Sequence, residues 1–296
     1  MTHFNVENYH AIPRSKKIQP RGDFSQMIAA LEKQPWLHKK QTEMDALIEE
    51  LDDAEQKTLI FELLGNFTYV CSHRLSDFLG GLAETISTQW GCTPHNTIIV
   101  ALNRGQCADS SQAILWHLKP AMAKRGAWTP NLFVIDIEEA AKQCNQHTHI
   151  ANVIIIDEFS GTGKTIDKEL NRFKNQLNNA SGLSIRIALV ALMQDAFEKF
   201  PDFIDDFYFL EDMRPGISSH IEESKRPEAI EIMKTLEGKL AQVARDKKLK
   251  KHIFGWGKSE ALYYYENGNT PNNVFPIFWW PEDVNGQQRL TLLNRV

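Results

Sequence analysis

The sequence has few cysteines, no long apolar run and no excess of basic charge, and each shortage excludes a class of protein. The four cysteines lie far apart without a C-x-x-C pair, which argues against a disulfide framework or a zinc site. No apolar stretch approaches the roughly 20 residues of a membrane-spanning helix, and the polar start does not resemble a signal peptide. The formal net charge of −5 gives no overall attraction to nucleic acid. We therefore expect a cytoplasmic protein with no membrane partner.

The composition that remains is typical of a globular protein with one large core. The chain has 296 residues, of which 42% are hydrophobic and 24% are charged. From residue 23 to residue 90, apolar residues recur at spacings of three and four, and strand-like alternation is missing, which predicts helices. We expect four parts: an N-terminal arm at 1–22, a helical cap at 23–92, an α/β core at 93–216, and a C-terminal helix with an aromatic-rich extension at 217–296.

Five short apolar runs in the middle of the chain predict a sheet. Most are rich in Ile and Val, as in strands that are buried on both faces. Helical or polar connections separate them, which favours an α/β fold with a mostly parallel five-stranded sheet flanked by helices. Ligands of such sheets lie beyond the carboxyl ends of the strands. The predicted strands are 97–102, 131–136, 152–157, 185–192 and 206–211.

The most informative segment is the third predicted strand and the loop after it. The strand ends in two adjacent carboxylates, Asp157 and Glu158, and a loop with two glycines and three hydroxyl side chains follows. A helix is predicted from Thr165 to Ala180. Backbone N–H groups of such a loop and helix N-terminus form a concave anion site. The carboxylates suit hydroxyl groups or magnesium, so a ribose 5-phosphate unit would satisfy both halves.

This segment resembles the 5-phosphoribosyl-1-pyrophosphate (PRPP) motif of type I phosphoribosyltransferases. That motif has four apolar residues, two acids, three variable residues and Thr-Gly-x-Thr, and Val153 to Thr165 fills every defining position. The resemblance implies that Asp157 and Glu158 hold the ribose hydroxyls and act indirectly on Mg²⁺, which accompanies PRPP as donor substrate. It also implies that a loop cradles the 5-phosphate, made of Ser160, Gly161, Thr162, Gly163, Lys164 and Thr165.

The same residues allow a second interpretation as a P-loop NTPase. Gly161 to Thr165 matches the end of the pattern G-x-x-x-x-G-K-[ST], in which Lys164 would be essential. The first glycine of that pattern would stand at position 158, which is Glu158. At roughly 4 Å and an effective dielectric near 20, that carboxylate would repel a phosphate charge by about 4 kcal/mol. The acids therefore argue against a P-loop.

Two further loops follow predicted strands. Arg104 and Gly105 come after the first strand, and Arg offers a planar fork for phosphate oxygens. The resemblance implies that this pair contacts pyrophosphate, with Arg104 in the catalytic group, and that Asp109 is a ligand of magnesium or water. The alternative is a helix cap beside a surface arginine. Arg214, after the fifth strand, is a candidate contact of pyrophosphate or of the acceptor.

The C-terminal extension combines aromatic and amide side chains, as a purine or pyrimidine acceptor would need. Asn272 and Asn273 are therefore candidate substrate residues. Residues 270–273 and 275–280 resemble the closing motif of phosphoribosyltransferase-like proteins of bacterial conflict systems. Those proteins are effectors in anti-phage defence, including retrons, beside a reverse transcriptase with its non-coding RNA and a helix-turn-helix protein. Basic residues at 245–251, on a predicted helix end, favour a solvated face over phosphate contacts.

The resemblance as a whole implies an enzyme that binds PRPP-Mg and transfers or cleaves its phosphoribosyl group. It would be a phosphoribosyltransferase, a glycosyltransferase acting on a pentose, and a toxin-like effector of antiviral defence. An alternative is an inactive PRPP- or nucleotide-sensing module that acts through partners. The sequence leaves open the acceptor and the oligomeric state, and a homo-oligomer is compatible with it.

Overall fold

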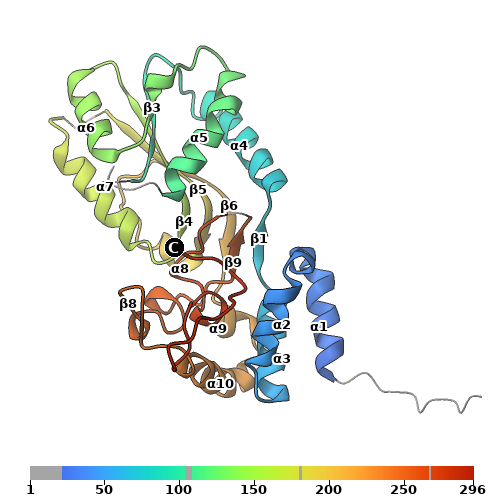
Figure 1. Cartoon of the computed structure of the whole chain (residues 1–296). Coiled ribbons are helices and arrows are strands. Elements are labelled where there is room, and N and C mark those ends of the chain that lie inside the picture. The colour runs from blue at the N-terminus through green and yellow to red at the C-terminus, as the bar shows by residue number, and fades with distance from the viewer. Residues whose placement is uncertain (1–21, 104–108, 180–181, 267) are drawn as a thin grey trace, which may run out of the picture.

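The structure is a computed structural model that describes residues 22–103, 109–179, 182–266 and 268–296 (Figure 1). The α-helices are α1 (Gly22–Lys33), α2 (Gln41–Glu49), α3 (Ala54–Gly65), α4 (Ser72–Ser87), α5 (Ser110–Ala123), α6 (Ile137–Gln146), α7 (Lys164–Gln176), α8 (Gln194–Phe197), α9 (Gly216–His220) and α10 (Arg226–Gly238). The strands are β1 (Thr68–Val70), β2 (Thr97–Ala101), β3 (Phe133–Val134), β4 (Asn152–Ser160), β5 (Ser184–Met193), β6 (Asp206–Met213), β7 (Val243–Ala244), β8 (Lys247–Lys248) and β9 (Tyr263–Tyr265). Short 3₁₀ helices are η1 (Pro35–Lys39), η2 (Pro130–Leu132), η3 (Glu223–Lys225), η4 (Leu249–Lys251), η5 (Trp256–Lys258) and η6 (Pro276–Phe278).

The core is a five-stranded parallel sheet with the order β3-β2-β4-β5-β6, which confirms the predicted class. The chain adds β3 on one side of β2, then returns to add β4, β5 and β6 on the other side. The strand order therefore reverses between β2 and β4, which is where open α/β sheets bind ligands. The central strand β4 is apolar up to Ile156 because helices cover both faces of the sheet.

Helices cover the two faces in the arrangement that right-handed crossovers require. Helices α4 and α5 pack together over β2, β4, β5 and β6, while α6 and α7 pack together on the opposite side (Figure 1). The helix α4 lies within the predicted helical cap, yet it packs against β5 and β6 of the sheet. Among the described helices, none is both long and apolar enough to span a membrane.

Two element boundaries differ from prediction in ways that matter for the site. Strand β4 continues to Ser160 rather than ending at Asp157, because it pairs with β5 as far as Ser160 opposite Leu192. Its pairing with β2 ends earlier, at Ile156 opposite Ala101. Strand β3 is shorter than predicted because a 3₁₀ helix precedes it and Asp136 caps the next helix. Helix α7 ends at Gln176, before the predicted Ala180.

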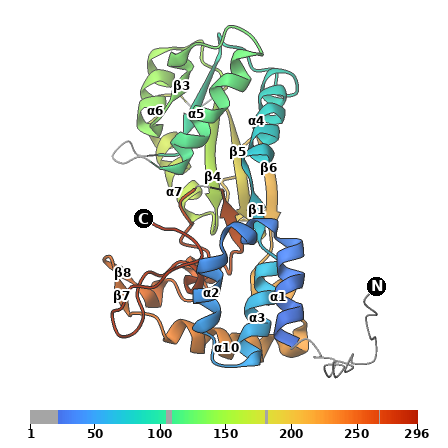
Figure 2. The same ribbon diagram turned by 45° about the vertical axis from the view of Figure 1, so that its right-hand side comes forward.

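Helix α3 packs against α10, and the C-terminal region, residues 239–296, packs beside them at one end of the sheet (Figure 2). Strand β1 pairs in parallel with β9, so the prediction that residues 23–90 hold no strand is wrong there. A three-residue strand carries no alternation that the sequence could reveal, and its partner lies far along the chain. The basic residues 245–251, predicted at a helix end, instead form a β-hairpin and a 3₁₀ turn.

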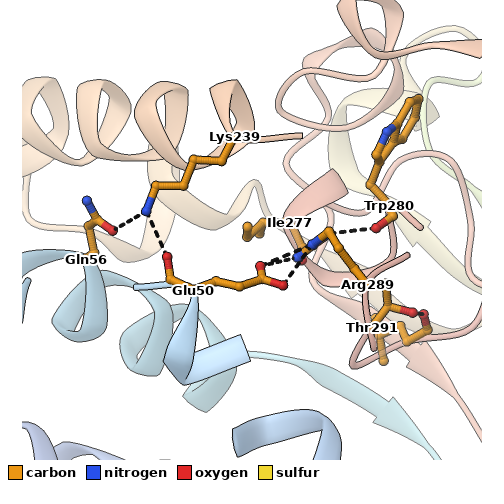
Figure 3. Close-up of polar contacts among 8 residues, drawn as sticks. Glu50, Gln56, Lys239, Ile277, Trp280, Arg289 and Thr291 are labelled. Carbon is orange, nitrogen blue, oxygen red and sulfur yellow. Dashed lines mark hydrogen bonds and ion pairs between the residues drawn. The ribbon is translucent and has the colours of Figure 1, made fainter. Parts of the chain in front are cut away.

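An ion pair joins these two regions (Figure 3). Arg289 is 5% exposed, and its Nε and Nη2 donate to the Glu50 carboxylate at 2.6–3.1 Å. The same guanidinium donates to the carbonyl oxygens of Trp280 (2.6 Å) and Ile277 (2.9 Å). Lys239 Nζ donates to the Glu50 carbonyl oxygen at 2.8 Å. These contacts, which we call the Glu50–Arg289 joint, connect α2 to α10 and to the aromatic segment near the C-terminus.

Candidate functional site

The candidate site lies where the strand order reverses, beside the end of β4 that extends past β2. A cavity of about 1510 Å³ opens there, between α4, α5, the end of β4 and the C-terminal segment. We call it the switch-point cavity. Its described lining residues include Asp109, Ser110, Asp157, Glu158, Phe159, Thr165, Asn272 and Arg295. The geometry thus gathers residues of two predicted loops and of the C-terminal extension around one space.

Asp157 stands at the first position of β4 that has no partner residue in β2, and it is partly exposed to the cavity. Its Oδ1 accepts a hydrogen bond from the Glu158 backbone N–H at 2.7 Å. Burial raises the pKa of Asp157 well above its ordinary value, and the charges of Asp109 and Glu158 add to that rise. Three acids near one another leave a surplus of negative charge, which favours hydroxyl donors or a cation.

Glu158 is almost fully buried, with 1% of its surface exposed. Burial raises its pKa to about 7, the hydroxyls of Ser110 and Tyr263 lower it, and the charge of Asp109 raises it. Glu158 Oε1 and the Tyr263 hydroxyl are both buried, and neither completes a hydrogen bond of normal geometry with any described residue. The Tyr263 ring packs on Phe159 with centroids 4.9 Å apart. A buried carboxyl with unused hydrogen-bonding capacity is suited to accept a ligand hydroxyl.

The loop that follows β4 leads into the N-terminus of α7, a helix of 13 residues. Gly163 precedes the helix with φ of +70°, and no described side chain caps it. The first intrahelical bond runs from Asp167 N to Gly163 O, so the N–H groups of the first turn lack intrahelical partners. Together with the helix dipole, these N–H groups form an anion site. Thr165 and Lys164 of this turn are both exposed, but only Thr165 is among the described residues that line the cavity.

A residue with a Cβ would not fit at Gly163. An added Cβ would lie 2.4 Å from the carbonyl oxygen of Ala196 in α8 and 3.0 Å from Lys199 Cβ. The left-handed φ adds a second reason for glycine. The loop is therefore closely packed against the helix that follows β5.

The second predicted loop is seen only in part. Arg104 and Gly105 lie outside the described residues, so their assignment to pyrophosphate stays a prediction. Asp109 caps α5, since its Oδ1 accepts from Ser111 Oγ at 2.5 Å and from Gln112 N at 3.3 Å. It also lines the switch-point cavity, so capping and a role at the site are compatible.

The three remaining predicted residues lie in different surroundings. Asn272 lines the switch-point cavity, and its Oδ1 is buried without a hydrogen-bond partner in the described part of the chain. Asn273 directs its amide elsewhere, because Nδ2 donates to Trp256 O at 2.9 Å and to Ser259 Oγ at 3.1 Å. Arg214 lies at a separate cavity of about 240 Å³. The geometry thus brings Asn272, but not Arg214, to the acids.

Two residues of the site were missed from the sequence. Tyr263 lies beside Glu158, but the run of three tyrosines gave no sign of which one faces inward. Arg295 lines the cavity, and its guanidinium lies 5.1 Å from the centre of the Trp279 ring. Burial lowers its pKa to about 10. Arg295 adds a cation to the lining, which also includes Lys124 and Arg125, and no local sequence pattern predicts its place.

The acids do not form a set of direct metal ligands. Within the residues that the structure describes, no three His, Cys, Asp or Glu side chains are grouped to hold a metal ion. A magnesium ion near Asp157 and Glu158 would need further ligands from water or from a bound molecule.

Comparison with protein families agrees with this geometry. The family model PRTase-CE matches residues 44–295, and the chain therefore belongs to that family and is a phosphoribosyltransferase-like protein. No match was found among curated proteins.

Proposed function

We propose that this member of the PRTase-CE family binds PRPP with magnesium in the switch-point cavity and transfers or cleaves its phosphoribosyl group. One observation carries the proposal: Asp157 and Glu158 face the cavity from the same strand whose loop leads into the N-terminus of α7. A diol-accepting pair and an anion site on one strand–loop–helix unit match the two ends of a ribose 5-phosphate.

In this proposal the acids hold the 2′- and 3′-hydroxyls, and the backbone N–H groups of residues 160–165 hold the 5-phosphate, so the Lys164 side chain is not required. Arg104 and Gly105 contact the pyrophosphate, and magnesium offsets part of its charge. The bond between the anomeric carbon and pyrophosphate breaks with its electron pair on the leaving group, and a nucleophile from the acceptor or water forms the new bond. The chain's own contribution is to position the sugar, stabilise the leaving charge and exclude water.

The proposal extends to biological role through the closing motif at residues 270–280. We place the protein among effectors of bacterial anti-phage defence, with a reverse transcriptase–RNA complex and a helix-turn-helix protein as partners. Expression without those partners should slow growth, and a variant with both acids replaced should not. Equal slowing by wild type and variant would argue against an effector that acts through this site.

Calorimetric titration of the purified protein with PRPP and Mg²⁺ tests the donor site. We expect the double variant Asp157→Ala, Glu158→Ala to lose about 2–3 kcal/mol of binding, or roughly 30- to 150-fold in Kd, because two hydrogen-bond acceptors are lost. Equal affinity of variant and wild type, or no heat with wild type, would refute the proposal.

Lys164→Ala is the matched control in the same loop. Its side chain is exposed, so PRPP affinity should change by less than about threefold. In a P-loop NTPase the same change would abolish ATP hydrolysis. Release of pyrophosphate from bound PRPP separates an active transferase from a sensing module, which would bind the donor without releasing it.

A further inference from the structure

We call residues 160–165 the phosphate-binding loop, after the role proposed for them above. This loop contacts the C-terminal region at two points. At Gly161, an added Cβ would lie 2.1 Å from Cγ and Nδ2 of Asn273. At Gly257, an added Cβ would lie 2.7 Å from Thr162 Cγ2. Such distances leave no room for even a methyl group, so the loop and the C-terminal region are in direct contact.

The C-terminal side of this contact is a turn with unusual backbone angles, residues 254–260. Its left-handed residues are Phe254 (φ 59°), Gly255 (78°), Gly257 (71°), Lys258 (57°) and Glu260 (50°). Left-handed angles are unfavourable for residues that carry a Cβ, and they persist only where surrounding contacts hold them. We call this segment the left-handed turn.

Asn273 supplies several of the contacts that hold the left-handed turn. Its Nδ2 donates to Trp256 O at 2.9 Å and to Ser259 Oγ at 3.1 Å. Its backbone oxygen accepts from Ala261 N and from Ser259 Oγ, both at 3.0 Å. The other end of the turn is fixed where Phe254 N donates to the buried Glu237 carboxyl at 3.0 Å.

We propose that Asn273 is a positioning residue for the phosphate-binding loop. The Asn273 side chain donates hydrogen bonds within the left-handed turn and also packs against Gly161. Helix α8 packs against Gly163, at the other end of the loop. Asn273 is not among the described residues that line the switch-point cavity, so it acts through the loop. The inference rests on the proposed function, and it makes the C-terminal region a determinant of donor affinity.

The experiment is a double-mutant cycle in full-length protein, read out as PRPP affinity by calorimetry. Asn273→Ala should weaken binding about 5- to 20-fold, because the loop loses its support and must be ordered by the ligand. Gly161→Ala should weaken binding at least about tenfold, because its methyl group meets the Asn273 side chain. The double variant should bind better than Gly161→Ala alone and approach Asn273→Ala, since the atoms that clash are gone.

Two controls separate positioning from general destabilisation. Asp136 caps α6, and its Oδ1 accepts a hydrogen bond from Glu138 N at 2.6 Å. Asp136→Ala removes this cap and should lower the melting temperature without changing PRPP affinity. Combining Gly161→Ala with Asn273→Asp keeps a side chain of the same size, so binding should not recover.

The possible failures are distinguishable. If wild type does not bind PRPP, the proposed function falls. If wild type binds but Asn273→Ala binds equally well, or if the double variant shows no recovery over Gly161→Ala, the positioning role is refuted while the donor site stands.

Discussion

The unit formed by β4, its loop and α7 differs from the C-terminal region, residues 239–296, in the sequence separation between the residues that build each of them. The first unit is built from neighbouring residues: an apolar strand, two acids, a glycine turn and a helix. The second holds strands of only two or three residues, short 3₁₀ helices and isolated bridges. The comparison teaches that the two acids and the loop after them are encoded locally, whereas the residues that surround them depend on distant contacts.

Many backbone N–H and C=O groups of the C-terminal region form hydrogen bonds with residues distant in the sequence, since its strands are too short for extended β-sheet pairing. Leu293 N donates to Phe278 O at 2.9 Å, and Thr270 N donates to Asn294 O at 3.0 Å. Large aromatic side chains, among them Trp280 and Phe275, are fully buried. An irregular chain with this much buried apolar surface is stable only while its contacts with the rest of the protein hold.

The largest expected effect on stability comes from breaking the Glu50–Arg289 joint (Figure 3). Glu50→Ala leaves the Arg289 guanidinium, 5% exposed, without its carboxylate. Removing one partner of a buried ion pair costs roughly 3–5 kcal/mol, and we expect about 3 kcal/mol because Glu50 is 30% exposed. Urea unfolding measures this loss, and PRPP affinity should fall with it if the C-terminal region supports the loop.

Lys39→Ala is the control, since Lys39 also joins the N-terminal helices to the C-terminal region. Its Nζ lies 3.3 Å from Glu266 Oε1, but the lysine side chain is 76% exposed. Exposed pairs contribute about 0–1 kcal/mol. Similar losses for Glu50→Ala and Lys39→Ala would show that burial does not distinguish the two contacts.

Alanine substitutions at three glycines with left-handed φ allow a direct comparison of the two regions. Gly163→Ala should cost about 2–3 kcal/mol, because its methyl group meets the backbone of α8 in addition to the strained φ. Gly257→Ala should cost about 1–2 kcal/mol, because it meets only the end of the Thr162 side chain. Gly286→Ala should cost about 1 kcal/mol, since φ is +76° but nothing lies within 4 Å.

Chemical denaturation gives these losses, and calorimetry with PRPP adds a second readout. Gly163→Ala and Gly257→Ala should both weaken binding, while Gly286→Ala should not. If Gly257→Ala bound PRPP as tightly as Gly286→Ala, the contact between the left-handed turn and the loop would carry no function.

The same contrast explains what the sequence could and could not predict. The parallel sheet, the acids Asp157 and Glu158 and the glycine loop all follow from patterns within about 15 residues, where periodicity and turn chemistry apply. The pairing of β1 with β9 and the place of Tyr263 depend on partners nearly two hundred residues apart. Local propensity carries no information on such contacts, so Arg295 and the role of Asn273 emerge only from the fold.

The smallest expected effects concern pH. Burial raises the pKa of Glu237 to about 8, so the stability it contributes is present below about 4.5 and is lost as pH rises toward 8.

The pKa of Glu266 shifts in the opposite direction. A hydrogen bond from Ser72 N, followed by one from Tyr69, lowers it to about 2, so its contribution is present above about 4.5 and is lost as pH falls toward 2. Because of Glu237, the free energy of unfolding should fall by about 1 kcal/mol per pH unit between about pH 6 and 7, and Glu237→Gln should abolish this fall. Glu266→Gln should cost about 1 kcal/mol at neutral pH, because the carboxylate is partly exposed, at 21% of its side-chain surface, and nothing near pH 2. Urea unfolding across this range measures both effects. Parallel pH profiles of stability for the two variants would contradict the opposite pKa shifts of Glu237 and Glu266.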